Sequence, residues 1–170
     1  MKRKVFTAAV LFWMCLTFWF SAQPADESSD RSLSVGKIVG EVFVPDYDKW
    51  TEKEQEAFAE RIDYPVRKAA HATEYACFAV LLMGMYQSYG LAGRRQIIAS
   101  FLSAAAYAAT DEFHQLFVPG RGCRVTDVLI DSLGAAAGIL IFLTVSFLLA
   151  RPAHRRKETE NVVLETKKTT

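Results

Sequence analysis

The sequence predicts an all-α protein, a bundle of four transmembrane helices with an extracytoplasmic loop that carries a short amphipathic helix. Two observations lead to this prediction. Apolar residues make up 51% of the 170-residue chain, which is high for a soluble fold. They also gather in long blocks, each close to or above the roughly 20 residues that a helix needs to cross a bilayer. We expect helices over about 5–22, 66–89, 95–116 and 126–150.

The first apolar block, residues 5–22, contains no charged side chain and follows three basic residues. A secretory signal peptide begins in the same way, so cleavage is an alternative. The block is longer than a usual signal core, however, and it carries the bulky side chains of Trp13, Trp19 and Phe20. Residues 21–24 also form a poor cleavage site. These features favour a retained helix.

The segment 23–65 is predicted to lie outside the membrane, with a polar loop to residue 34 and an irregular stretch over 35–44. Thr51 followed by Glu54 is a capping-box pattern, which predicts the start of a helix. Apolar side chains fall on one side of this helix, as on a helix that lies on a membrane surface. Pro65 is expected to end it and to begin the next helix, because proline blocks helical continuation backwards.

Small residues predict how the later helices pack. Asp127, Asp131, Gly134 and Gly138 share one strip of the last predicted helix, and glycines on such a strip let a second helix approach closely. Small side chains recur at every fourth position of the third predicted helix, at Ser100, Ala104 and Ala108. We therefore expect the third and fourth helices to pack tightly.

Basic residues in the short flanks predict the orientation. They precede the first helix, separate the second from the third and follow the fourth: Lys2, Arg3, Lys4, Arg94, Arg95, Arg151, Arg155, Arg156 and Lys157. If four helices cross the membrane, all of these basic residues lie on one side of it. We therefore expect a multi-pass protein of the cell membrane with both termini in the cytoplasm. The charged segment 151–170 is predicted to be a disordered tail. A net charge of +1 gives no support to nucleic-acid binding.

The same topology collects polar side chains at one face of the membrane, because the second helix starts outside, the third ends outside and the fourth starts outside. The candidate site comprises Arg67, Lys68, His71, Glu74, Asp111, Glu112, His114, Gln115, Arg121, Asp127 and Asp131. An ionised side chain at membrane depth costs about 3 kcal/mol unless it is paired, hydrated or used. We therefore expect a functional polar site in the outer-leaflet half, although its catalytic residues, if any, are unknown.

Structural roles are the alternative for each group. His71 and Glu74 share a helix face and could form a pair that fixes the helix end. Asp127 could serve as an N-terminal charge favoured by the helix dipole. Arg121 could neutralise acidic neighbours in a static network.

No metal site or cofactor is predicted. Asp111 and His114 could ligate a cation, but two histidines with scattered acids do not define a metal site. Cys15 and Cys77 lie within apolar blocks as small fillers, and Cys123 lies alone in a loop. The cysteines therefore indicate neither a disulfide framework nor a metal centre.

Four stretches together resemble the VanZ-like family and cover most of residues 5–150. They are Ser21 to Pro24, Val66 to Tyr75, the run Asp111-Glu112-Phe113-His114-Gln115-Leu116-Phe117-Val118-Pro119-Gly120-Arg121, and Asp127 to Gly134. The departures, Ala72, Cys123 and Arg124, touch no ionisable position of the pattern. The resemblance implies a four-helix bacterial membrane protein of the cell envelope. The family's namesake is linked to reduced susceptibility to teicoplanin, an antibiotic-resistance role.

Three functions are compatible with this reading. The first is binding of a membrane lipid, a lipid-linked molecule or a glycopeptide, with Arg67, Lys68, Arg121 and Arg124 meeting an anionic group. The second is a membrane enzyme in which His71 or His114 is the general base and carboxylates share protons. The third is a proton-coupled carrier, which would need oligomers because four helices are few for a pore.

Overall fold

A computed structural model describes the backbone of residues 1–168 and the side chains of residues 1–150. All regular structure in this described part is helical, so the all-α prediction is confirmed there. In chain order the elements are α1 (Lys2–Ser21), α2 (Ala25–Phe43), the 3₁₀ helix η1 (Tyr47–Lys49), α3 (Glu52–Ser88), α4 (Gly93–Gln115) and α5 (Val125–Lys168). The disorder expected for residues 151–170 falls on residues without described side chains and stays a prediction.

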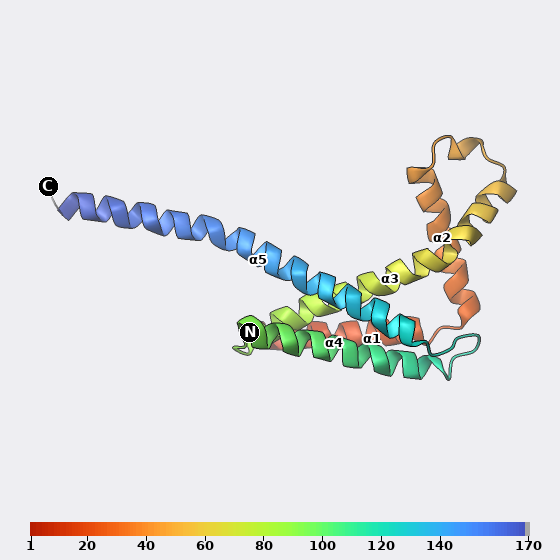
Figure 1. Cartoon of the computed structure of the whole chain (residues 1–170), viewed down its shortest axis with the longest axis horizontal. Coiled ribbons are helices and arrows are strands. Elements are labelled where there is room, and N and C mark those ends of the chain that lie inside the picture. The colour runs from red at the N-terminus through yellow and green to blue at the C-terminus, as the bar shows by residue number, and fades with distance from the viewer. Residues whose placement is uncertain (169–170) are drawn as a thin grey trace.

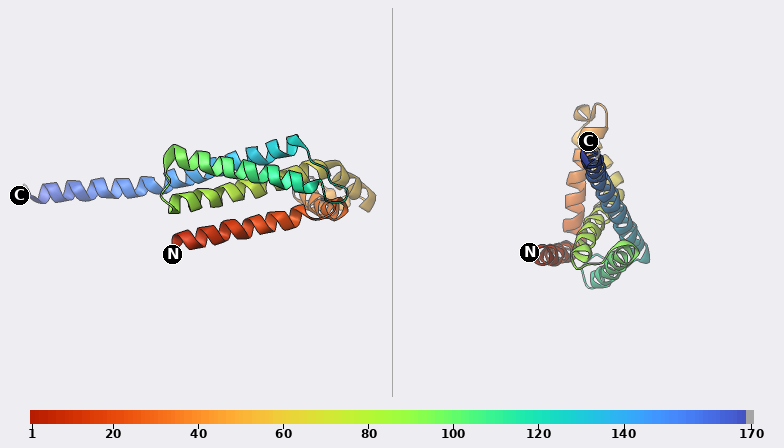
Figure 2. Two further views of the ribbon diagram at one scale, coloured as in Figure 1. Left: turned by 90° about the horizontal axis from the view of Figure 1, so that it is seen from below. Right: turned by 90° about the vertical axis from the view of Figure 1, so that its left-hand side faces the viewer.

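The helices α1, α3, α4 and α5 run side by side as a bundle, and α2 projects from one end of it together with the first part of α3 (Figures 1 and 2). The N-terminus and the α3–α4 connection lie at the opposite end, where Arg3 Nε donates a hydrogen bond to the carbonyl of Ser88 over 2.9 Å. Along the bundle, Tyr107 of α4 donates to the carbonyl of Met14 over 2.6 Å. The α1–α2 link and the α4–α5 loop therefore share the end that carries α2.

The core of the bundle is built around α3. Its buried apolar members come from α1, α3, α4 and α5 and are Val10, Tyr75, Phe78, Ala79, Leu82, Met83, Ala104, Ala108, Ala135 and Ile139. Small residues on α4 and α5 let these helices lie close to the larger side chains of α3. Helix α3 thus holds the bundle together.

The glycine strip of α5 packs against α3. A Cβ atom at Gly134 would lie 2.2 Å from the carbonyl oxygen of Ala72, and one at Gly138 would lie 2.1 Å from that of Ala76. The third and fourth predicted helices, α4 and α5, pack against each other as expected, but the glycine strip itself faces α3 and not α4. Helix α3 offers alanines at the same four-residue spacing, so the backbones of α3 and α5 approach each other there, while the small residues of α4 are buried in the adjoining core.

Pro65 lies inside α3, and the prediction that it ends one helix and begins another was wrong. The capping box of Thr51 and Glu54 is present at the start of the helix, and the hydrogen bonds from Thr51 lower the pKa of the Glu54 carboxyl. An interior proline removes a backbone hydrogen bond. Here an ion pair of 2.8 Å between Asp63 and Arg67 spans the proline, and α2 packs alongside. These contacts offset the lost hydrogen bond.

Helix α2 replaces the loop and irregular stretch expected over residues 23–44. Its sequence contains glycine, serine and valine, which are poor helix formers, so local propensity argued against it. Tertiary contacts favour the helix: a Cβ atom at Gly36 would lie 3.1 Å from the Cα of Ala59, and Ser32 donates a hydrogen bond to Asp63. Asp26 in the first turn adds a favourable interaction with the helix dipole.

Two described helices are long and apolar enough to cross a membrane, Lys2–Ser21 and Val125–Ala150. Helices α3 and α4 carry more charged residues, with acidic groups at the end of the bundle near α2. Composition therefore supports two of the four predicted crossings.

Replacing Gly138 by alanine is expected to destabilise the bundle by about 1–3 kcal/mol, because the added methyl meets a carbonyl of α3. Thermal unfolding of the purified protein in lipid nanodiscs measures the effect. Gly122→Ala is the matched control, since a Cβ atom there has no neighbour within 4 Å. Equal unfolding temperatures for the two variants would contradict the close approach of α3 and α5.

Candidate functional site

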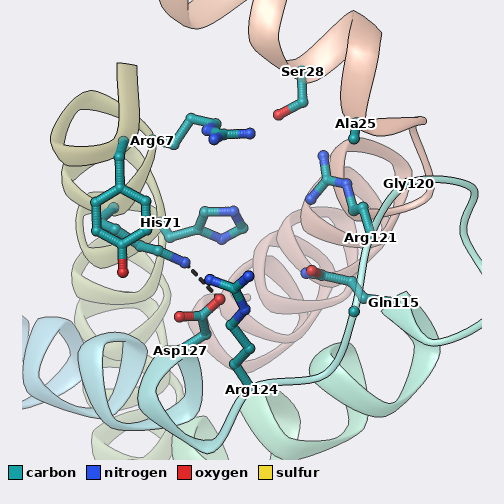
Figure 3. A pocket seen from close by; sticks show the side chains of 12 residues that line it. Ala25, Ser28, Arg67, His71, Gln115, Gly120, Arg121, Arg124 and Asp127 are labelled. Carbon is teal, nitrogen blue, oxygen red and sulfur yellow. Dashed lines mark ion pairs between the residues drawn. The ribbon is translucent and has the colours of Figure 1, made fainter. Parts of the chain in front are cut away.

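A polar cavity of about 190 Å³ lies at the end of the bundle, between α2, α3, the α4–α5 loop and the start of α5 (Figure 3). Its charged and polar lining residues are Ser28, Tyr64, Arg67, Lys68, His71, Gln115, Arg121, Arg124 and Asp127. Six of these, all except Ser28, Tyr64 and Arg124, belong to the candidate site that the sequence predicted. Figure 3 shows the guanidinium groups of Arg67 and Arg121 and the imidazole of His71 directed into the same space.

The α4–α5 loop is held in place by the link between α1 and α2. Arg121 Nε donates to the carbonyl of Gln23 over 2.9 Å, and the backbone N–H of Ala25 donates to the carbonyl of Pro119 over 3.2 Å. Gly120 has a φ of +74°, a left-handed conformation that favours glycine. Burial lowers the pKa of Arg121, yet an arginine stays protonated in proteins. The loop therefore keeps a half-buried cation in the cavity.

Ion pairs fix two of the other cations. Lys68 Nζ lies 2.5 Å from the Asp127 carboxylate, which ties α3 to the start of α5. Arg67 pairs with Asp63 and also lies 3.4 Å from the hydroxyl of Ser29, so it links α3 to α2. Asp127 thus forms an ion pair with another helix. Its role is therefore more than that of a negative charge favoured by the dipole at the start of α5.

A second, larger cavity of about 520 Å³ adjoins the first between the end of α1, α2 and α3. Apolar side chains form much of its wall: Phe20, Val35, Val66, Ala69 and Ala70. Ser28, Arg67, His71 and Arg121 line both cavities, and Glu74 lines the apolar one. A polar and an apolar space therefore meet at His71.

Beside the cavities lies a buried polar layer. Asp111 and Asp131 are 3% and 2% exposed, and each has one carboxylate oxygen without a hydrogen-bond partner among the described residues. The hydroxyl of Tyr75 is also buried without a partner there, and the hydroxyl of Ser21 lies beside Asp111. Tyr75 interacts electrostatically with both carboxylates, and Gln115 donates to Asp111 over 3.4 Å. Unpartnered buried polar atoms are rare and point to a functional role or to bound water.

The remaining predicted residues lie apart from the cavities. The ring of His114 stacks on Phe18 of α1 with centroids 4.4 Å apart and lines neither cavity. Glu112 is buried and accepts a hydrogen bond from the backbone N–H of Arg124 over 2.9 Å. Among the described residues, His71 and Glu74 share no hydrogen bond, so the structure lacks the pair that would fix the helix end.

Sequence reasoning missed Ser21, Gln23, Ser28 and Tyr75 as members of the site. Tyr75 follows Glu74 within a stretch that carried the family resemblance, so this signal was available. Ser28 belongs to α2, which the sequence did not predict as a helix. Gln23 contributes its backbone carbonyl. Every residue has this group, so the residue type at position 23 could not indicate the contact. Among the described residues, no group of three or more His, Cys, Asp or Glu side chains is arranged to hold a metal ion.

The fold and site define an all-α protein with apolar helices that surround a polar end. Residues 6–149 match the VanZ/LLP1 family, and the chain therefore belongs to this VanZ-like family. The resemblance seen in the sequence is thereby confirmed, and with the two apolar helices it supports an association with membranes. Neither a curated protein nor a solved structure matches the chain.

Proposed function

We propose that this VanZ-like protein binds an anionic, chain-bearing ligand at the outer leaflet of the cell membrane. The observation that carries the proposal is the junction of two cavities of opposite character, which share Arg67, His71 and Arg121. A ligand with a charged head and an apolar chain would occupy both. Lipids and lipid-linked molecules have this form.

The polar cavity suits an anionic head group. Four cationic side chains line it, those of Arg67, Lys68, Arg121 and Arg124, whereas Asp127 is its single acidic lining residue. Arginine is the side chain best suited to bind carboxylates and phosphates through paired hydrogen bonds. The volume of about 190 Å³ is below the roughly 300–1,000 Å³ of sites for drug-sized ligands. A small head group is therefore favoured over a whole glycopeptide.

The apolar cavity suits the chain of the ligand. Its volume of about 520 Å³ lies within that range, and its wall continues from α1 to α2 and α3. The exposed ring of Trp19 on α1 lies against Arg31, which lines this cavity. A chain in this cavity would thus continue into surrounding lipid.

We place the protein across the membrane four times, with both termini in the cytoplasm. The apolar helices α1 and α5 support two crossings, and many large apolar side chains on their outer faces are exposed, as lipid-facing residues are. Helices α3 and α4 lie beside them in the same bundle (Figure 2). With this topology, the basic flanks favour a location of the cavities at the outer leaflet. Any effect on teicoplanin susceptibility would follow from capture of an envelope lipid there.

Binding of a decyl-chain anion tests the proposal. Decyl phosphate is expected to bind the protein in phosphatidylcholine nanodiscs at least about tenfold more tightly than neutral decanol, a difference of about 1.4 kcal/mol. Titration calorimetry measures both, with empty nanodiscs correcting for partition into lipid. Ala70→Trp, which fills the apolar cavity, and Arg67→Gln, which removes a shared cation, should each weaken binding about fivefold or more.

Two controls match these variants. Ala137→Trp adds the same bulk on an exposed face of α5, and Arg94→Gln removes an exposed cation at the other end of the bundle. Both should bind decyl phosphate as the unaltered protein does. If no decyl anion binds more tightly than decanol, the proposed function fails.

The orientation can be tested with the protein's own cysteine. Cys123 is exposed in the α4–α5 loop, so a membrane-impermeant maleimide should label it in intact cells. In a Cys123→Ala variant that carries Ala92→Cys in the α3–α4 connection, labelling should require permeabilised cells. Labelling of Cys123 from the cytoplasmic side only would reverse the orientation.

A second candidate function is catalysis on an envelope lipid. It is favoured by the unpartnered carboxylate oxygens of Asp111 and Asp131 beside the cavities, because buried carboxylates can move protons during a reaction. His71 is exposed to both cavities and could act as a general base, with Tyr75 and Glu74 nearby. This arrangement would suit attack by water or a substrate hydroxyl.

Lipid mass spectrometry separates catalysis from binding. An enzyme should change the lipid profile of cells that overexpress it, and the change should vanish in His71→Ala and Asp111→Asn variants expressed at the same level. The Arg94→Gln variant should keep the altered profile. An unchanged profile with the unaltered protein would exclude lipid modification under those conditions and leave binding.

A further inference from the structure

The cations of the polar cavity differ in how their charges are balanced. Arg67 is paired with Asp63, and Lys68 is paired with Asp127. Arg121 and Arg124 form no ion pair among the described residues. Arg121 donates instead to the backbone carbonyl of Gln23, which carries no net charge.

The buried carboxylates nearby do not complete this balance. Asp111, Glu112 and Glu74 interact electrostatically with Arg121, but none of them lines the polar cavity or forms an ion pair with Arg121 in the described part of the chain. Glu112 accepts its hydrogen bond from the backbone of Arg124 rather than from the guanidinium. Among the described residues that line the polar cavity, Arg121 and Arg124 thus have no ion-pair partner.

The two groups are arranged to meet one ligand. Figure 3 shows the guanidinium groups of Arg121 and Arg124 on different sides of the same space, with the amide of Gln115 between them and His71 opposite. Each guanidinium offers a planar set of N–H donors that matches the oxygen spacing of phosphate. A tetrahedral head group with several acceptor oxygens can contact both.

We propose that the head group bound here is a phosphate dianion, as in a phosphomonoester that carries an apolar chain. The proposal rests on the proposed function and narrows its ligand class. Two arginines without ion-pair partners match a head group of charge −2 better than a sulfate ester or a phosphodiester, each of which carries a charge of −1. A phosphomonoester has a second pKa of about 6 and is mostly a dianion at pH 7.5.

Decyl phosphate and decyl sulfate share a chain and a tetrahedral head but differ in charge, so they isolate this property. In phosphatidylcholine nanodiscs at pH 7.5, the protein should bind decyl phosphate at least about tenfold more tightly than decyl sulfate. Arg124→Gln should reduce this ratio about threefold or more. Because the Arg124 side chain is exposed, this variant should keep the unfolding temperature of the unaltered protein. Arg121→Gln should reduce the ratio as well, whereas Arg94→Gln should leave it unchanged.

The outcomes separate the two proposals. Equal affinity for decyl phosphate and decyl sulfate, both above that of decanol, would overturn the dianion and leave the proposed function standing. If neither anion exceeds decanol, both proposals fail. Inorganic phosphate tests whether a soluble phosphate is the ligand. If it binds as tightly as decyl phosphate, the site recognises a phosphate dianion but the proposed role of the apolar chain is overturned.

Discussion

The close contact between α5 and α3 is the constraint on which the polar end of the protein depends. Gly134 and Gly138 bring the two backbones together, since any side chain there would overlap the carbonyls of Ala72 and Ala76. Asp131 lies one turn before Gly134 on the same strip, and Asp127 lies one turn before that. The contact that stabilises the bundle therefore also directs one carboxylate into the protein interior and brings the other to Lys68.

The sequence was sufficient to predict the helical class and the end of the bundle at which charged residues gather, because apolar block length and residue order determine both. It did not predict α2, whose stability comes from contacts with Ala59 and Asp63 that are distant in sequence. The prediction at Pro65 was wrong for the same reason. Local chemistry predicts a helix end there, whereas the ion pair between Asp63 and Arg67 and the packing of α2 stabilise a continuous α3. The predicted partner of the glycine strip was incorrect because α3 and α4 both carry small residues at four-residue spacing.

The candidate site shows a similar division. Residues such as Arg67, His71 and Arg121 were predicted to lie together, because their positions at helix ends place them at one depth. The separation of a polar cavity from an apolar one was not predictable, since α2 forms part of both walls. His114 shows that depth in the bundle is not sufficient to predict membership of the site. It lies at the expected end of the bundle, but its position on α4 turns the ring towards Phe18.

Helix α1 is joined to the bundle by hydrogen bonds that have a consequence for how the chain matures. Trp13 Nε1 donates to the carbonyl of Glu74, and the carbonyl of Met14 accepts from Tyr107. Removal of α1 by a signal peptidase would leave the Tyr107 hydroxyl without this acceptor, and a lost hydrogen bond costs about 1 kcal/mol. It would also free the N-terminal side of Gln23, whose carbonyl holds the loop that carries Arg121. Cleavage after α1 would therefore remove contacts that hold the loop carrying Arg121 beside the polar cavity.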